Sequence, residues 1–163
     1  MSACCDTTSL AKQLSRGAET CPGCRKRSKS VSLETVKAML SVSLELVHST
    51  NYHFCATETC PVVYFAADGQ QVFTKVDMRE QVHQKAPLVD DVFVCYCFRH
   101  TPMSLRKEVA TSGHSTAVAS ITAGIQAGKC ACEIRNPQGS CCLGNVKAVL
   151  HQIVDPALIR SRV

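Results

Sequence analysis

The sequence of 163 residues contains no tryptophan and few other aromatic residues, with three tyrosines and five phenylalanines. A chain of this length can form one medium domain or two small ones. So few large side chains predict a small hydrophobic core that needs another source of stability. No run approaches about 18 consecutive apolar residues, so no transmembrane helix is predicted. The sequence also lacks a phosphate loop, a Ser-His-Asp signature and a catalytic carboxylate pair, so no hydrolytic or group-transfer site is predicted.

The N-terminal segment has no apolar run and no cleavage pattern, so it is not predicted to be a secretory signal. We therefore expect a cytoplasmic protein, in which thiols stay reduced. Twelve cysteines are far more than a chain of this size normally carries. Reduced cysteines at short spacings are more often metal ligands than disulfides, so bound metal is the predicted source of the missing stability. A disulfide framework is the alternative.

The character of the sequence changes near residues 83–91, with loops and strands before this point and helices after it. This order predicts an α+β fold. Residues 60–77 form two β-rich runs around Asp68-Gly69, which predicts a hairpin. Residues 33–40 have helical spacing with Thr35 as a cap, and residues 41–47 suit either a strand or a longer helix.

Three helices are predicted in the second half. Thr101-Pro102 should begin the first, which ends near Gly113. Ser115 should cap the second. The third should run over about residues 142–154 and end at Asp155-Pro156.

Two short cysteine motifs in the first half predict a structural zinc site. In "CPGC", proline and glycine bend the backbone so that the thiols of Cys21 and Cys24 face one point. "FCATETC" supplies Cys55 and Cys60 just before the hairpin. Four thiolates from two turns suit tetrahedral zinc at about 2.3 Å. His53 could replace one thiol but is expected at the surface or beside the site. A redox-active CxxC is the alternative, although no apolar strand precedes the motif.

Six cysteines in the second half predict an iron–sulfur site. A two-iron cluster needs four thiolates, and helix N-termini help to stabilise its negative charge. Cys95 and Cys97 precede the first predicted helix, and Cys132 and Cys142 complete the chosen set. Cys130 and Cys141 are expected to be small buried apolar residues. A second zinc on the same cysteines is the competing interpretation.

The stretches "YHFCATETCPVVYF", "VCYCFRHT" and "CEIRNPQGSCC", in this order, resemble the N-terminal domain of CopZ-type copper chaperones over residues 20–152. The resemblance implies zinc on Cys21, Cys24, Cys55 and Cys60. It also implies a [2Fe–2S] cluster on Cys95, Cys97, Cys132 and Cys142. The implied fold is a small zinc-bound hairpin lobe packed on a short-helix lobe of the bacterioferritin-associated ferredoxin type. The M-x-C-x-x-C loop of the copper-carrying domain in two-domain members is not found in this sequence.

The expected organisation is a flexible arm (1–18), a zinc lobe (19–85), a cluster lobe (86–155) and a tail (156–163). The resemblance implies copper handling, with an electron from the cluster reducing Cu(II) to Cu(I). The implied partners are a copper carrier or exporter and a reductase that donates electrons. Cys4 and Cys5 on the arm could form a Cu(I) site, because Cu(I) prefers thiolates.

Two other functions remain open at this point. One is a Cu(I)-binding module without redox activity. The other is a zinc ribbon that binds nucleic acid through "CRKRSKS", which carries much of the net charge of +5. We expect this basic segment to be a solvated loop whose cations offset the charge of a zinc–thiolate site. Lys85 and Asp90-Asp91 are expected to be solvent-exposed residues of a linker.

Overall fold

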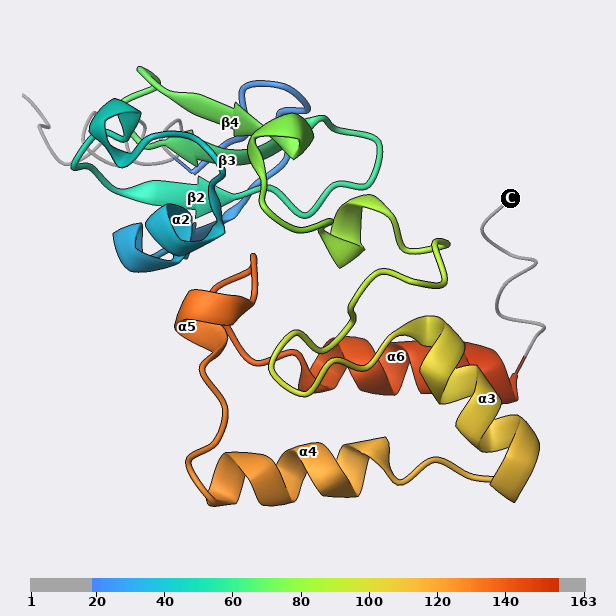
Figure 1. Cartoon of the computed structure of the whole chain (residues 1–163). Helices are drawn as coiled ribbons and strands as arrows, with labels where there is room; N and C mark the ends of the chain where they lie inside the picture. The colour runs from blue at the N-terminus through green and yellow to red at the C-terminus, as the bar shows by residue number, and fades with distance from the viewer. Residues whose placement is uncertain (1–18, 156–163) are drawn as a thin grey trace, which may run out of the picture.

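The computed structural model describes residues 19–155, in which a sheet with one packed helix is followed by four further helices (Figure 1). We call residues 19–85 the sheet region and residues 86–155 the helical region. The strands are β1 (Lys29–Val31), β2 (Tyr52–Phe54), β3 (Val62–Ala66) and β4 (Val72–Thr74). The α-helices are α2 (Leu33–Met39), α3 (Pro102–Ser112), α4 (Ala117–Gln126), α5 (Cys132–Arg135) and α6 (Leu143–Val154). Three short 3-10 helices are η1 (Leu44–Leu46), η2 (Lys75–Asp77) and η3 (His83–Lys85). The fold is α+β, as predicted.

The four strands form one antiparallel sheet in the order β1-β2-β3-β4. All five side chains of β3 are buried, which suits its run of β-branched and aromatic residues. The turn from β3 to β4 passes through Gly69 at φ +73°, a conformation that glycine adopts without strain. The predicted hairpin is therefore confirmed, whereas β1 and β2 have no counterpart in the sequence-based prediction.

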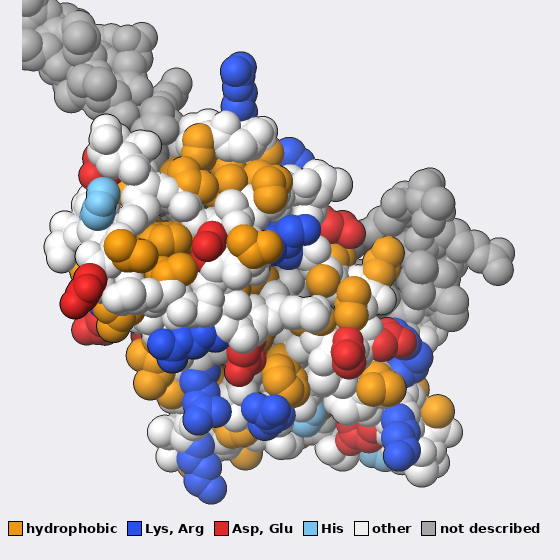
Figure 2. All heavy atoms as spheres, turned by 45° about the horizontal axis from the view of Figure 1, so that its top comes forward, with side chains coloured by type: hydrophobic (Ala, Val, Ile, Leu, Met, Phe, Trp, Pro, Cys, Tyr) orange, Lys and Arg blue, Asp and Glu red, His pale blue; other side chains and the backbone are white. Residues whose placement is uncertain are grey.

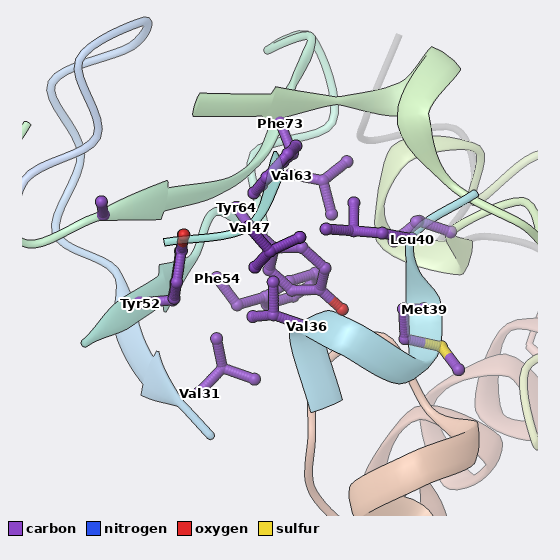
Figure 3. Packing of buried hydrophobic residues seen from close by; sticks show 12 residues of the cluster. Val31, Val36, Met39, Leu40, Val47, Tyr52, Phe54, Val63, Tyr64 and Phe73 are labelled. Atoms are coloured by element: carbon purple, nitrogen blue, oxygen red, sulfur yellow. The ribbon is translucent and has the colours of Figure 1, made fainter. Parts of the chain in front are cut away.

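Helix α2 packs its apolar side on the sheet and closes the first core (Figure 3). The backbone N–H of Thr35 donates to the Ser32 hydroxyl at 3.1 Å, so Ser32 caps the helix and the prediction of Thr35 as cap is wrong. Residues 41–47 contain η1, so they form neither a strand nor a longer helix. Val36, Met39 and Leu40 meet the sheet side chains in a core that also includes Val31, Val47, Tyr52, Phe54, Val63, Tyr64, Phe73 and Val82.

Local hydrogen bonds fix the ends of the helices in the helical region. Thr101 and Ser104 form a reciprocal capping box at the start of α3, and Gly113 ends it at φ +78°. At the start of α4, the Glu108 carboxylate accepts hydrogen bonds from Thr116 N–H at 2.8 Å and from the Ser115 hydroxyl at 2.7 Å. The predicted helix starts and the end of α6 are confirmed, but α4 is capped by Glu108 together with Ser115.

The two regions meet at the turn that follows α5, which we call the junction turn (residues 136–140). The Tyr64 hydroxyl, fully buried under the sheet, donates to the Pro137 carbonyl at 2.6 Å. Gly139, at φ +65°, lies against Val31 and Thr35. Figure 1 shows α5 beside α2, in agreement with the contacts between these helices. The segment between Cys132 and Cys142 is therefore held by the sheet region.

The basic segment is exposed at Arg25, Lys26 and Arg27, and Arg27 forms an ion pair with Glu19 at 2.8 Å. Lys29 lies in β1, so the segment is only partly the loop that was expected. On the face in Figure 2, lysine and arginine side chains lie among acidic and apolar ones rather than in one patch. No helix within residues 19–155 has the length and apolar character to cross a membrane.

Candidate metal centres

The first candidate centre joins thiols from two separate turns of the sheet region. The Sγ atoms of Cys21, Cys24, Cys55 and Cys60 all lie within 4.8 Å of one another. Two of the separations are 3.8 Å, between Cys21 and Cys60, and 3.7 Å, between Cys24 and Cys55. A tetrahedral ion with metal–sulfur bonds of about 2.3 Å requires sulfur–sulfur edges of about 3.8 Å. The thiols therefore stand where four ligands of one tetrahedral ion would stand.

The backbone around these thiols explains the sequence of the first turn. A Cβ atom on Gly23 would lie 3.0 Å from Cys60 Sγ and 3.1 Å from Val62 Cγ2, so the turn can approach the second pair closely only with glycine there. Arg25 follows at φ +59°, which is unusual for a large side chain and typical of functional turns. Amides of Gly23 and Cys24 donate to Cys21, and that of Val62 donates to Cys60. Such donors stabilise thiolates.

Three of the thiols, Cys21, Cys24 and Cys60, have shifted pKa values. Burial raises the pKa of Cys21 to about 12 and also raises the pKa of Cys60. Burial opposes ionisation of Cys24 as well, but hydrogen bonds with the Thr57 hydroxyl and the Lys26 amide outweigh it and lower the pKa to about 6. Of these three thiols Cys24 ionises most readily, and a bound cation would favour the ionisation of Cys21 and Cys60 as well.

Two basic residues near this centre are buried, and only the second of them against expectation. His53 has 7% of its surface exposed and stacks on Phe65 with ring centroids 5.4 Å apart, so it is a core residue. It is not part of the converging thiol group. Lys85 has 6% of its surface exposed, and its Nζ donates to the Thr57 carbonyl at 2.8 Å. The prediction that Lys85 is an exposed linker residue is wrong, because its side chain turns into the protein beneath the second cysteine turn.

The second candidate centre begins with a tight loop in the helical region. Backbone hydrogen bonds join Cys95 and His100 in both directions, at 3.1 and 3.2 Å, and close the loop that carries Cys95 and Cys97. Phe98 packs against Gly124 of α4 so closely that a Cβ there would lie 2.3 Å from the ring. Arg99 completes the loop at φ +58°. Within residues 19–155, Arg25 and Arg99 are the non-glycine residues with positive φ, and both follow a cysteine turn.

The four cysteines of this centre form two pairs. Cys97 Sγ lies 3.8 Å from Cys132 Sγ, and Cys95 lies near enough to Cys142 for each thiol to shift the pKa of the other. These four do not all come within 4.8 Å of one another, because the first set is the one such group in the described part of the chain. Cys132 is the first residue of α5, and Cys142 immediately precedes α6. The predicted placement of Cys142 at a helix start is confirmed.

Backbone amides surround these sulfurs as well. Ala131 N–H donates to Cys97 Sγ at 3.3 Å, and the amides of Cys97 and Phe98 donate to Cys95. The hydrogen bond with Cys142 lowers the pKa of Cys95 to about 7, and the same contact raises the pKa of Cys142. Burial raises the pKa of Cys132 to about 12. The centre is thus arranged for negative charge that the metal-free thiols cannot all carry.

Comparisons with known proteins found a family model, a relative and a solved structure similar to this chain. A CopZ-type family model described as "Zinc binding domain" matches residues 18–79. The copper chaperone CopZ of Archaeoglobus fulgidus is 34% identical over 122 residues, which cover 75% of this chain and 57% of that protein. The X-ray structure of the Archaeoglobus fulgidus CopZ N-terminal domain is similar with a TM-score of 0.65 and 30% identity, covering 80% of this chain and 96% of that chain. The chain belongs to the family of the CopZ N-terminal domain.

The comparisons cover different parts of this chain and of the similar proteins. The zinc-binding family model covers the sheet region up to residue 79, and so includes all four cysteines of the first centre. The solved CopZ domain is matched over nearly its whole length, whereas the chain spans 57% of the full CopZ protein. The remainder of that protein lies outside the match.

The other cysteines of this CopZ-family chain lie outside both sets. Cys130 is half-buried and Cys141 is exposed, so the expectation of two small buried residues is wrong for Cys141. The ten cysteines within residues 19–155 are free thiols. Cys4 and Cys5, predicted as a Cu(I) site, lie outside the described residues.

Sequence analysis missed two features that shape these centres. Lys85 gives no signal in its local sequence, because its burial depends on a turn 28 residues earlier in the chain. The contact between Phe98 and Gly124 is equally distant in sequence. Only the glycine inside an otherwise regular helical pattern could have drawn attention to α4, since such a glycine often marks a close approach.

Proposed function

We propose that the first centre binds one structural zinc ion through Cys21, Cys24, Cys55 and Cys60. Support comes from the separations of 3.7 and 3.8 Å, which match the edges of a zinc–thiolate tetrahedron. The family model for this region describes a zinc-binding domain. An all-thiolate set leaves no open coordination position, so the ion stabilises the fold and does not activate a substrate.

We further propose that Cys95, Cys97, Cys132 and Cys142 hold a [2Fe–2S] cluster. The pairing carries this proposal: each iron of such a cluster takes two cysteines, and the thiols stand in two pairs rather than in one tetrahedron. This arrangement favours a cluster over a second mononuclear zinc. The amides that face these sulfurs and the start of α6 would offset the charge of four thiolates.

The function that these centres support best is copper handling with a redox step. The similar Archaeoglobus protein is a copper chaperone. Reduction of Cu(II) to Cu(I) consumes one electron, which a reduced two-iron cluster supplies as it returns to its oxidised state. The partners of this function are a reductase that donates the electron and a copper carrier or exporter that accepts Cu(I). Its site of action is the cytoplasm, where the thiol ligands remain reduced.

Metal analysis of the anaerobically isolated chain tests the two centres. We expect one zinc, two irons and two acid-labile sulfides per chain, from the compositions of the two centres. Cys55→Ser should lose zinc, and Cys97→Ser should lose iron and sulfide but keep zinc. Cys130→Ser is the matched control and should keep both metals. Absence of iron and sulfide from the wild type after anaerobic reconstitution would refute the cluster.

Copper reduction needs its own assay, because free thiols also reduce Cu(II). The reduced protein is mixed anaerobically with Cu(II), and Cu(I) is measured with a specific chromophoric chelator. The electron paramagnetic resonance signal of the reduced cluster is followed in the same samples. We expect one Cu(I) for each cluster oxidised, and only the slower thiol reaction in Cys97→Ser. Equal rates of Cu(I) formation in the two proteins would refute the proposal that the cluster reduces Cu(II).

A further inference from the structure

The side chain of Lys85 is a buried cation, and it is a ligand in neither candidate metal centre. It belongs to η3, at the end of the sheet region, and has 6% of its surface exposed. Its Nζ donates to the Thr57 carbonyl at 2.8 Å. One carbonyl does not offset the cost of removing an unpaired ammonium group from water. The position therefore requires a negative partner.

No carboxylate fills this role among the residues that the structure describes. The ion pairs within residues 19–155 join Arg27 to Glu19 and Arg106 to Asp90, and both pairs are exposed. Glu58, close to Thr57 in the sequence, is also exposed and makes no ion pair with Lys85. The negative partner must be sought among the groups that surround Thr57.

Thr57 lies at the centre of the second cysteine turn and contacts the thiol set on two sides. Its carbonyl, which receives Lys85, also accepts the backbone N–H of Cys60 at 3.2 Å. Its hydroxyl oxygen lies 3.4 Å from Cys24 Sγ. A single residue thus separates the ammonium group from the converging thiols. Four thiolates around one divalent zinc carry a net charge of minus two.

We propose that Lys85 is the buried counter-charge of the zinc–thiolate centre, and that it raises the affinity of the site for zinc. The inference rests on the proposed zinc site. The cations expected in this role are exposed, so water and salt screen them; they are Arg25, Lys26, Arg27 and Lys29. Lys85 is shielded from water, so its charge acts at greater strength on a neighbour across Thr57.

The test separates charge from hydrogen bonding by four substitutions in the full chain. Lys85→Met removes the charge and the donor, Lys85→Gln keeps a donor without charge, and Lys85→Arg keeps the charge. Lys147→Met, on an exposed position of α6, removes the same charge from the surface as a control. The zinc content of each protein is measured first, and the zinc affinity is then obtained by competition with a chromophoric chelator. Cobalt(II) spectra report whether the four-thiolate geometry is kept.

We expect zinc affinity to fall at least tenfold in both Lys85→Met and Lys85→Gln, and to stay within threefold of wild type in Lys85→Arg and Lys147→Met. Failure of the two neutral variants to fold, with folding of Lys85→Arg, supports the same conclusion. Wild-type affinity in Lys85→Gln would overturn the proposal, because a hydrogen bond would then suffice. Equal losses in Lys85→Arg and Lys85→Gln would also overturn it. A wild-type chain without zinc would refute the zinc site itself and this inference with it.

Discussion

Replacement of Gly139 by alanine tests the contact that joins the junction turn to the sheet region. The residue has φ +65°, and its added Cβ would lie 2.8 Å from Val31 Cγ2 and 3.0 Å from Thr35 Oγ1. The left-handed conformation costs an alanine about 1–2 kcal/mol. Displacement of the two buried neighbours adds about 1–3 kcal/mol. We therefore expect Gly139→Ala to lower the free energy of unfolding by about 2–5 kcal/mol.

Gly69 provides a matched control for this prediction. It has φ +73°, and an added Cβ would meet no atom within 4 Å. Gly69→Ala should therefore show only the conformational cost, about 1–2 kcal/mol. Thermal unfolding followed by circular dichroism measures both variants, and each kcal/mol should lower Tm by about 2–4 °C for a chain of this size. If Gly139→Ala is no less stable than Gly69→Ala, the close packing of the junction turn does not hold in solution.

Three further substitutions test other contacts. Tyr64→Phe leaves the buried Pro137 carbonyl without its donor and should cost about 1–3 kcal/mol in chemical denaturation. Gly124→Ala should destabilise by about 1–3 kcal/mol through its clash with Phe98. The control Gly144→Ala in α6 meets no neighbour and should stabilise by about 0.5–1 kcal/mol; equal effects would exclude the clash. Hydrogen bonds from Ser115 and Thr116 lower the pKa of Glu108 from 4.5 to about 2, so its contribution to stability is present above pH 4.5 and lost as pH falls toward 2. Glu108→Gln should therefore be less stable than wild type at pH 7 but not at pH 2.

The sequence predicted the elements whose signals are local. The hairpin around Gly69 and the start of α3 at Thr101-Pro102 each depend on turn or cap residues that act within a few positions. Strands β1 and β2 have three residues each and exist through their pairing with other strands. No period of two can be recognised in so short a run, so these strands could not be predicted.

In the candidate centres, too, local features could be predicted and long-range contacts could not. The zinc site on Cys21, Cys24, Cys55 and Cys60 could be predicted from the spacing of each cysteine pair, because ligand spacing within a turn is a local property. The burial of Lys85 was missed, because the residues around a lysine in the sequence give no sign of the distant elements that will cover it. Its position depends on Thr57, which lies in the second cysteine turn.

The cysteines of the two sets do not interleave along the chain: the first set ends at Cys60, and the second begins at Cys95. During translation, domains fold from the N-terminus as the chain emerges. The thiols of the first set therefore emerge from the ribosome before those of the second set. The order of synthesis separates the two sets in time, so the first four cysteines can come together before the later ones are exposed.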